Sequence, residues 1–256
     1  MAKAADPPAG ALAWLTLQIG TLYETDREGR LLRANEPAES ADGAGGDAAP
    51  FLFFGRTKLG NLWRLRTGLP DALLRELARL AAAERVAPDL EAVPERLHAM
   101  RTRIEAHAPV VHAFAGLAFR FPAPDGAATR ARVADVAASA VRELDAAGLA
   151  RAAEVFPRLA PSLSERQPVF GVLPDGVPRS IAYCATRPGR ACEVGVDTAP
   201  GWRGKGFAAS AVSAWAAEMQ GRGVIPLYSA ALENAASRAV AARLGLIPYA
   251  SDWHFR

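Results

Sequence analysis

Apolar and polar positions in the first part of the chain form short runs separated by turn signals. Residues 13–23 and 30–34 are rich in apolar side chains and flank the turn Asp26-Arg27-Glu28-Gly29, which predicts a β-hairpin. Residues 51–54 and 61–66 predict two more strands around a glycine-containing turn. Between these pairs, residues 36–50 lack large apolar side chains and are rich in Ala, Gly, Asp and Glu, so they predict a mobile surface loop.

A helical period begins near Pro70, which suits a first helical position. The leucines that follow recur at the spacing of one helix face: Leu73, Leu74, Leu77 and Leu80. This pattern predicts an amphipathic helix. Residues 94–107 predict a second helix, and residues 117–121 predict a short strand.

The best candidate for a linker is the segment Pro122-Ala123-Pro124-Asp125-Gly126, which holds two prolines and a glycine. We predict a linker at 122–128, an N-terminal α+β domain of unknown role at 1–121 and a second domain at 129–256. The second part is predicted to contain a strand near 130–133, helices at 137–147 and 149–159, and strands at 169–173, 180–185, 192–197 and 224–229.

The strand predicted at 192–197 leads into a glycine-rich turn and then a helix. Apolar residues on one face indicate the helix: Ala208, Ala211, Val212, Trp215 and Met219. The turn reads Arg203-Gly204-Lys205-Gly206-Phe207-Ala208. The first turn of a helix carries unpaired backbone N–H groups and the positive end of the helix dipole, and glycines let an anion approach both. The sequence therefore predicts a site for a cofactor that carries a di- or triphosphate.

Three known kinds of phosphate-binding loop are candidate interpretations of this turn. A P-loop ends in Gly-Lys-Ser/Thr, which is absent here. The dinucleotide fingerprint G-x-G-x-x-G/A is matched at 204–209, but residues 198–203 separate its first glycine from the strand, and too little chain remains for a Rossmann fold. The third pattern, Arg/Gln-x-x-Gly-x-Gly/Ala, is matched at every fixed position at 203–208.

With this motif the chain resembles the Gcn5-related N-acetyltransferase (GNAT) superfamily. The resemblance covers residues 130–256 and is strongest at 192–249, where the motif lies between two predicted strands and is followed by Asn234 and a helix ending at Leu244-Gly245-Leu246. The implied fold class is α/β with a mixed α+β sheet. A GNAT-like acyltransferase fold is expected at the C-terminus, with a smaller α+β domain before it.

The resemblance implies acetyl-CoA (coenzyme A) as the cofactor. In the family the two strands beside the motif helix splay apart, and the pantetheine arm pairs with the first of them. Carried over to this chain, the cofactor-binding residues are Val194, Gly195, Val196, Arg203, Gly204, Lys205, Gly206, Phe207, Ala208, Asn234 and Ser237. Trp202 either stacks near the adenine or anchors the turn.

Attack on a thioester requires a neutral amine, and a lysine-like amine has a reference pKa of about 10.4, so a base is useful at neutral pH. Strand alternation directs Val194 and Val196 to the core and leaves Glu193, Gly195 and Asp197 facing an acceptor cleft. Because family members often use a carboxylate on this strand, Glu193 is the first candidate base and Asp197 the second. Both residues could equally be ordinary solvated carboxylates.

The acid that protonates the leaving thiolate differs from the family pattern. Many members carry a tyrosine seven residues after the asparagine, and this chain has Ala241 there. Ser237, Tyr228 and Tyr249 are the other candidate proton donors, each of which also has a structural interpretation. A coenzyme A thiol has a pKa comparable with the value of about 8.5 for cysteine, so departure without an acid is chemically tolerable.

Composition and charge indicate which partners, cellular location and metals to expect. The net charge is +3 and no basic face is clustered, so we expect no nucleic-acid partner. No apolar run approaches the length of a membrane span, and the N-terminus lacks signal-peptide features, so a cytoplasmic location is expected. The two cysteines, Cys184 and Cys192, predict buried residues on neighbouring strands, and the four histidines lack metal-ligand spacing, so no metal is expected.

The leading hypothesis is an N-acetyltransferase that moves an acetyl or short acyl group to an amine, either a small molecule or a peptide. One alternative is a catalytically silent acyl-CoA-binding or sensing module, which the missing tyrosine favours. A Rossmann-like unit that binds NAD is the third option. The acceptor is not decodable from the sequence, and no oligomeric state is assigned, a dimer being one option.

Overall fold

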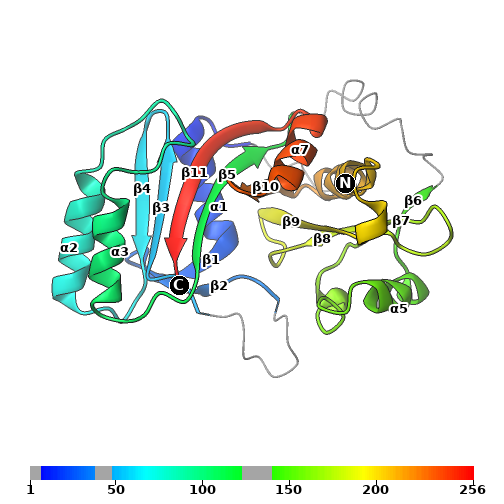
Figure 1. Ribbon diagram of the computed structural model, residues 1–256, viewed down its shortest axis with the longest axis horizontal. Helices are drawn as coiled ribbons and strands as arrows, with labels where there is room; N and C mark the ends of the chain where they lie inside the picture. Colours follow the sequence, from blue (N-terminus) through cyan, green and yellow to red (C-terminus); the bar gives the residue numbers. More distant parts are fainter. Residues whose placement is uncertain (1–6, 38–47, 123–139) are drawn as a thin grey trace.

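The computed structural model describes residues 7–37, 48–122 and 140–256. Its main feature is a mixed sheet in which the described strands follow the order β4-β3-β11-β5-β10-β9-β8-β7-β6 (Figure 1). A separate two-stranded sheet, β1-β2, lies beside it. Helices cover both faces of the large sheet, as expected for the α/β class. The predicted fold class is confirmed.

The first helix, α1 (Ala11–Leu22), corrects the strand predicted at 13–23. Its buried positions Trp14, Leu15, Gln18 and Ile19 recur every three or four residues, which is a helical period. The hydroxyl groups of two threonines donate to carbonyls one turn earlier, so these residues are accommodated within the helix. The predicted hairpin does exist, but its first strand is only β1 (Tyr23–Thr25), which pairs with β2 (Leu31–Ala34).

The predicted strands at 51–54 and 61–66 are confirmed as β3 (Leu52–Thr57) and β4 (Gly60–Leu65). The predicted helices are confirmed as α2 (Asp71–Ala82) and α3 (Leu97–Glu105). They pack their apolar faces on β3 and on the end of the last strand, with Leu77, Met100 and Ile104 in the core. Strand β5 (Ala113–Arg120) is longer than the predicted 117–121.

In the second part, the described residues begin with β6 (Val141–Glu143), which pairs with β7 (Phe170–Val172). The helix predicted at 137–147 is therefore wrong over 140–145, where the segment contains the edge strand β6, and only its last two residues are helical, as the start of α5 (Ala146–Val155). Helix α5 lies close to the helix predicted at 149–159, with Asp145 as its N-cap. A short 3-10 helix, η2 (Leu163–Glu165), follows. The strand predicted near 130–133 and most of the linker at 122–128 lie outside the described residues.

The remaining elements follow the predicted order. They are β8 (Ser180–Cys184), β9 (Ala191–Thr198), η3 (Pro200–Trp202), α6 (Phe207–Gly221), β10 (Ile225–Ala231), α7 (Ala235–Leu244) and β11 (Ile247–Phe255). Cys184 and Cys192 are buried free thiols in one core cluster, on the antiparallel pair β8–β9, as predicted.

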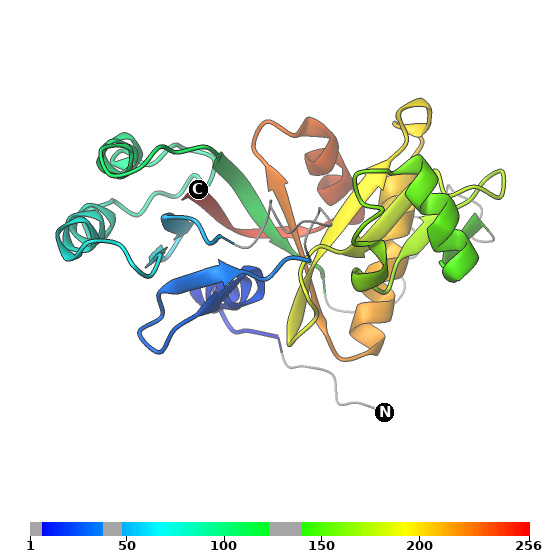
Figure 2. The same ribbon diagram turned by 90° about the horizontal axis from the view of Figure 1, so that it is seen from below.

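Strands from the two parts of the chain alternate in the sheet. β5 lies between β10 and β11, and β11 continues on to pair with β3 (Figure 1). Helix α1 packs on one face of these strands and α2 and α3 on the other (Figure 2). The division into domains at 1–121 and 129–256 stays a prediction, but any such domains share one continuous sheet.

The parallel pair β9–β10 opens partway along its length. The paired residues run from Ala191 and Ile225 to Glu193 and Leu227, while both strands continue for four or more residues beyond that point. Beyond Glu193, β9 remains paired with β8 on one side and faces a gap in the hydrogen-bonding ladder on the β10 side. Helices α6 and α7 pack over the face of this region that carries Val194 and Tyr228.

Candidate active site

The glycine-rich turn gives α6 an open N-terminus. Gly204 and Gly206 have φ values of 76° and 81°, in the left-handed region that side chains disfavour. Gly206 is the N-cap, and among the described residues no side chain caps the helix and no acidic residue lies in its first turn. The first backbone N–H groups of α6 thus lack helical partners and keep their capacity to bind an anion.

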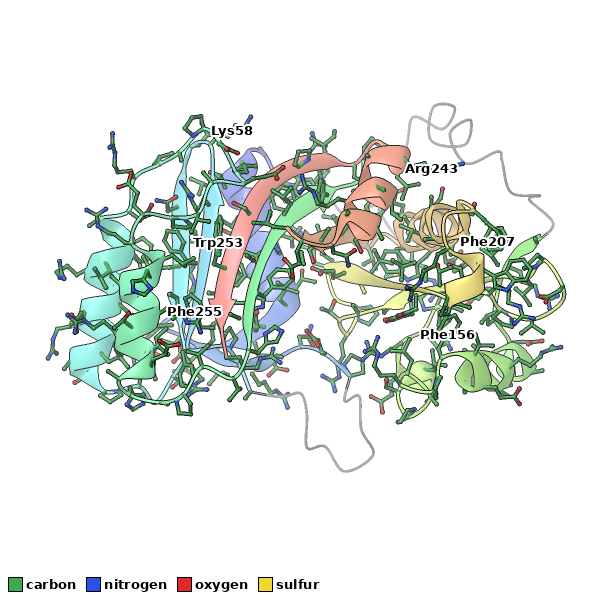
Figure 3. The ribbon with its side chains drawn as sticks, viewed as in Figure 1. Lys58, Phe156, Phe207, Arg243, Trp253 and Phe255 are labelled. Carbon is green, nitrogen blue, oxygen red and sulfur yellow. The ribbon has the colours of Figure 1, made fainter. Side chains whose placement is uncertain are left out.

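A pocket of about 470 Å³ adjoins this turn and the neighbouring helix α7. Most of the predicted cofactor residues line it: Val196, Arg203, Gly204, Gly206, Phe207, Ala208, Asn234 and Ser237. Val194 and Gly195 on β9 and Lys205 at the turn are not part of this lining. Figure 3 shows Phe207 at the start of α6 and Arg243 on α7. The motif turn and helix α7 therefore line the same pocket.

Two basic residues of the motif contact the protein itself. Arg203 Nε donates to the carbonyl of Thr198 at 3.3 Å. Lys205 Nζ lies 4.5 Å from the centre of the Trp202 ring, and that ring stacks on Phe207 at 5.6 Å. Trp202 thus anchors the turn through Lys205 and Phe207, which is the second of the two interpretations drawn from the sequence.

The two faces of β9 separate the core from the candidate catalytic groups. Val194 is buried in the cluster that contains α6, and Val196 packs against that cluster. Strand alternation places Glu193, Gly195 and Asp197 on the opposite face. This division of the two faces agrees with the one predicted from the sequence, while the acceptor cleft stays a prediction.

Glu193 lies where the pairing of β9 and β10 ends. The Ser229 hydroxyl of β10 donates to its Oε1, while Oε2 is buried with no hydrogen-bond partner in the described structure. Burial raises the pKa of Glu193 to about 7, although the hydrogen bond from Ser229 lowers it. A carboxyl group with a pKa near neutrality and one free oxygen is suited to exchange protons with an amine.

Asp197, the second candidate base, has partners for its carboxylate. Tyr183 donates to Oδ2 at 2.9 Å, and Arg158 lies 3.5 Å from the same oxygen. The Tyr183 ring also lies directly over Gly195, leaving no room for a side chain there. Tyr183 therefore covers this end of the face, and Asp197 holds Tyr183 in place.

The candidate proton donors lie near α7. Asn234 caps this helix by accepting from the Ser237 N–H at 3.0 Å, and both residues line the pocket. The Tyr228 hydroxyl donates to the Ser237 carbonyl at 3.1 Å, and burial raises its pKa to about 12. Ala241 is buried in the core and carries no proton donor. Tyr249 donates to Gln18 on α1, on the other face of the sheet.

Sequence reasoning missed three groups near the site. Ser229 bonds to the candidate base, and Arg243 lines the pocket. Asp252 of β11 is buried and accepts from Gln18 at 3.2 Å, and burial, together with the charge of Glu193, raises its pKa to about 8. Ser229 was detectable, since its position on β10 follows from strand alternation. The other two depend on how α7 and β11 pack, which no local pattern specifies.

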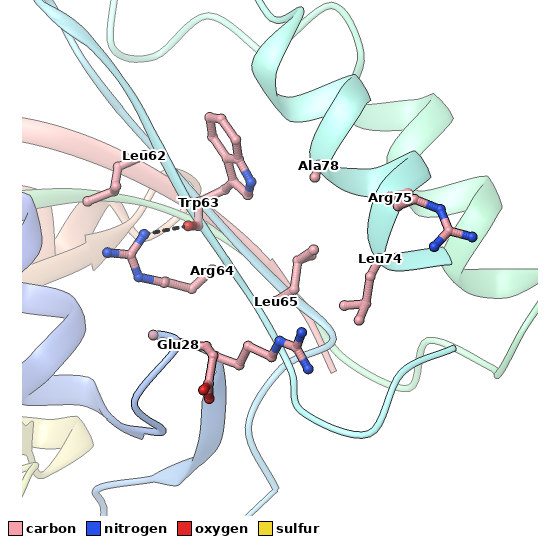
Figure 4. Close-up of a pocket in the computed structure, with 10 residues that line it drawn as sticks. Glu28, Leu62, Trp63, Arg64, Leu65, Leu74, Arg75 and Ala78 are labelled. Atoms are coloured by element: carbon pink, nitrogen blue, oxygen red, sulfur yellow. Dashed lines mark hydrogen bonds between the residues drawn. The ribbon is translucent and has the colours of Figure 1, made fainter. Parts of the chain in front are cut away.

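A second pocket, of about 460 Å³, lies in the first part of the chain between β4, α2 and the β1–β2 turn. Figure 4 shows Trp63 and Leu65 on the α2 side of β4, with Leu62 and Arg64 on the other side. The Arg64 guanidinium donates to the Trp63 carbonyl at 2.8 Å. Since β4 is an edge strand, this pocket straddles the edge of the sheet and is separate from the candidate site.

Within 7–37, 48–122 and 140–256, no group of three or more His, Cys, Asp or Glu side chains is arranged to hold a metal ion. Every helix in the same ranges is too short or too polar to cross a bilayer.

Comparison with known families identifies the region around the site. Residues 170–250, which contain β9, the turn, α6, β10 and α7, match the GNAT acetyltransferase family model. The chain contains a GNAT acetyltransferase domain. No curated protein matches the chain. The motif turn and the opened β9–β10 pair thus lie within the matched GNAT region.

One solved structure of a GNAT protein shares the fold, and two others align with lower TM-scores. A GCN5-related N-acetyltransferase-like protein from Streptococcus suis aligns with a TM-score of 0.50 at 18% identity, over 81% of this chain and 85% of its own. A GNAT-family protein from Novosphingobium aromaticivorans aligns with a TM-score of 0.47 at 22% identity, over 57% of this chain and 66% of its own, just under two thirds. A tandem GNAT protein from the clavulanic acid biosynthesis pathway aligns with a TM-score of 0.44 at 15% identity, over 75% of this chain and 72% of its own.

Proposed function

We propose that the chain is an acetyl-CoA-dependent N-acyltransferase in which an amine acceptor, a small molecule or a peptide, attacks the thioester directly. The observation that carries this proposal is Glu193, a carboxylate with one buried, unpartnered oxygen at the point where β9 and β10 separate. A cofactor site alone would not require such a group. A base with a pKa of about 7 is half ionised at neutral pH, which suits proton transfer from an amine.

The residues that would hold coenzyme A fit an anionic, elongated group. The uncapped N–H groups of α6 and the two glycines suit a diphosphate, and a side chain at Gly206 would fill the space beside Arg243. The exposed edge of β9 beyond Glu193 offers backbone groups to the pantetheine arm. When bound, acetyl-CoA supplies the acetyl group as a thioester.

In the proposed reaction Glu193 removes a proton from the acceptor as the amine nitrogen bonds to the acetyl carbon. When bound, acetyl-CoA would give up its acetyl group as the carbon–sulfur bond breaks, and the departing thiolate would take a proton from solvent. Ser229 orients the Glu193 carboxylate through its hydrogen bond. No hydroxyl occupies position 241, so the thiolate leaves without the tyrosine typical of the family, which its moderate pKa tolerates.

Thiol release from acetyl-CoA over a panel of amines tests this function. We expect acceptor-dependent release by the unaltered chain and a fall in kcat/KM of about 100-fold or more in Glu193→Gln, with coenzyme A affinity retained. Tight coenzyme A binding without acceptor-dependent release would instead favour a silent acyl-CoA-binding module. The buried Ala241 is the feature that makes this second function worth testing.

A further inference from the structure

Three basic side chains surround the glycine-rich turn, and they come from different places in the sequence. Arg203 and Lys205 belong to the turn, while Arg243 belongs to the last turn of α7. Arg203 bonds to the carbonyl of Thr198 and Lys205 lies on Trp202, so part of each side chain is engaged by the protein. All three side chains make contacts within the protein, and Arg243 lines the pocket from α7.

The position of Arg243 is defined by its contact with Gly206. A Cβ atom at Gly206 would lie 3.2 Å from Arg243 Nη2 and 3.3 Å from Cζ. The guanidinium therefore lies against the residue that begins α6, and it lines the same pocket as Gly204 and Ala208. An anion bound at the first turn of α6 would meet backbone N–H groups and this guanidinium together.

We propose that Arg243 is a ligand of the coenzyme A diphosphate and adds side-chain charge to that subsite. The inference rests on the proposed function, since it assumes that coenzyme A is the ligand of the pocket. A planar guanidinium can donate two parallel hydrogen bonds to a phosphate, which a lysine ammonium cannot. The charge of Arg243 also complements the C-terminal end of α7.

The helix that carries Arg243 is held firmly at both ends. Asn234 caps its N-terminus, and Gly245 ends it with φ of 65°. Ala241 and Leu244 are buried beside Arg243, whose own side chain is exposed. The backbone beneath the guanidinium is thus fixed before the cofactor arrives, and a substitution at this exposed position leaves the core intact.

Calorimetric titration of Arg243→Gln with coenzyme A and with dephospho-coenzyme A tests the proposal. Dephospho-coenzyme A keeps the diphosphate and lacks the 3′-phosphate. We expect both ligands to lose affinity by about 10- to 100-fold, because a charge-assisted bidentate contact to the diphosphate is lost. Arg243→Lys should recover part of the loss, since it restores the charge but not the pair of parallel hydrogen bonds.

Arg238→Gln is the matched control on the same helix, because Arg238 bonds to Glu91 and to the carbonyl of Leu232 instead of facing the turn. It should leave both affinities within about twofold of the unaltered chain. Unchanged affinities in Arg243→Gln would overturn the proposal, as would a loss confined to coenzyme A, which would assign Arg243 to the 3′-phosphate. Failure of the unaltered chain to bind either ligand would instead reject the proposed function.

Discussion

Helices α2 and α6 each follow a strand and a glycine-containing turn, yet their N-termini differ in chemistry. Helix α6 begins at Gly206 without a capping side chain or an acidic residue in its first turn. Helix α2 follows Pro70, which has no N–H group, and places Asp71 in its first turn. A carboxylate at the positive end of a helix already neutralises the charge that would attract an anion.

This difference shows why only one of the two strand–turn–helix units suits a phosphate-bearing cofactor. The segment before α2 reads Arg66-Thr67-Gly68-Leu69-Pro70-Asp71, with leucine and aspartate where the motif before α6 has Gly206 and Ala208. The two parts of the chain therefore contribute different features to the candidate site. The second provides the proposed cofactor site, and the first provides strand β5 and helix α1 around the candidate base.

The largest expected effect follows from separating the two parts. A fragment of residues 129–256 would lose β5, which pairs with both β10 and β11, and it would expose those strand edges and their apolar faces. We expect no cooperative thermal unfolding and no coenzyme A binding, since the lost pairing and burial exceed the typical stability of about 5–15 kcal/mol. Calorimetry and circular dichroism would check this. A folded fragment that binds coenzyme A would establish 129–256 as an independent domain.

The two glycine turns offer a matched pair of substitutions. Gly206→Leu should reduce coenzyme A affinity by about 100-fold or more, because the side chain would enter the pocket beside Arg243. Gly68→Leu imposes a similar backbone strain, since Gly68 has φ of 75°, but nothing surrounds its Cβ position. Each variant should lose about 1–3 kcal/mol of stability, and only Gly206→Leu should lose binding. Equal affinities in calorimetry would contradict the assignment of the subsite.

Ser229→Ala should change the pH dependence of catalysis. The Ser229 hydroxyl lowers the pKa of Glu193, so its loss should raise that pKa above about 7. A base acts only when ionised, so activity falls as the pH drops through this pKa, and the acid limb of kcat/KM should move to higher pH in the variant. We also expect a several-fold lower rate at pH 7. An unshifted limb would show that a different group controls the profile.

The smallest expected effect concerns the helix caps. Asn234 caps α7 within the pocket, and Asp145 caps α5 away from it by accepting from the Gly148 N–H at 2.8 Å. Asn234→Ala and Asp145→Ala should each lower the free energy of unfolding by about 1 kcal/mol. Only Asn234→Ala should also weaken coenzyme A binding, by a few-fold. Similar binding by both variants would limit Asn234 to capping.

Much of the proposed cofactor site was predictable, because its sequence signals lie in neighbouring residues. The turn at 203–208 combines glycines, a preceding strand and an amphipathic helix, and each signal depends on neighbouring residues only. The helix predicted after Asn234, with its end at Leu244, is observed as α7, because Asn234 and Gly245 mark its ends. The face of β9 that carries Glu193 followed from the alternation of strand side chains.

The sequence could not reveal what depends on distant packing. The threonines and bulky side chains of 13–23 are typical of a strand, whereas the helical period of α1 becomes evident only from its burial against the sheet. Strand β5 lies between β10 and β11, and it is more than 100 residues away from both of them in the sequence. Arg243 faces Gly206 only because α7 packs beside α6, so its role required the tertiary structure.

The number of coenzyme A molecules bound by the intact chain tests the central claim most directly. Calorimetric titration should give one site per chain, and Gly206→Leu should weaken binding at this site by about 100-fold or more while Gly68→Leu leaves it unchanged. Two equivalent sites, or a single site that keeps its affinity in Gly206→Leu, would contradict the claim that the open N-terminus of α6 is the cofactor subsite.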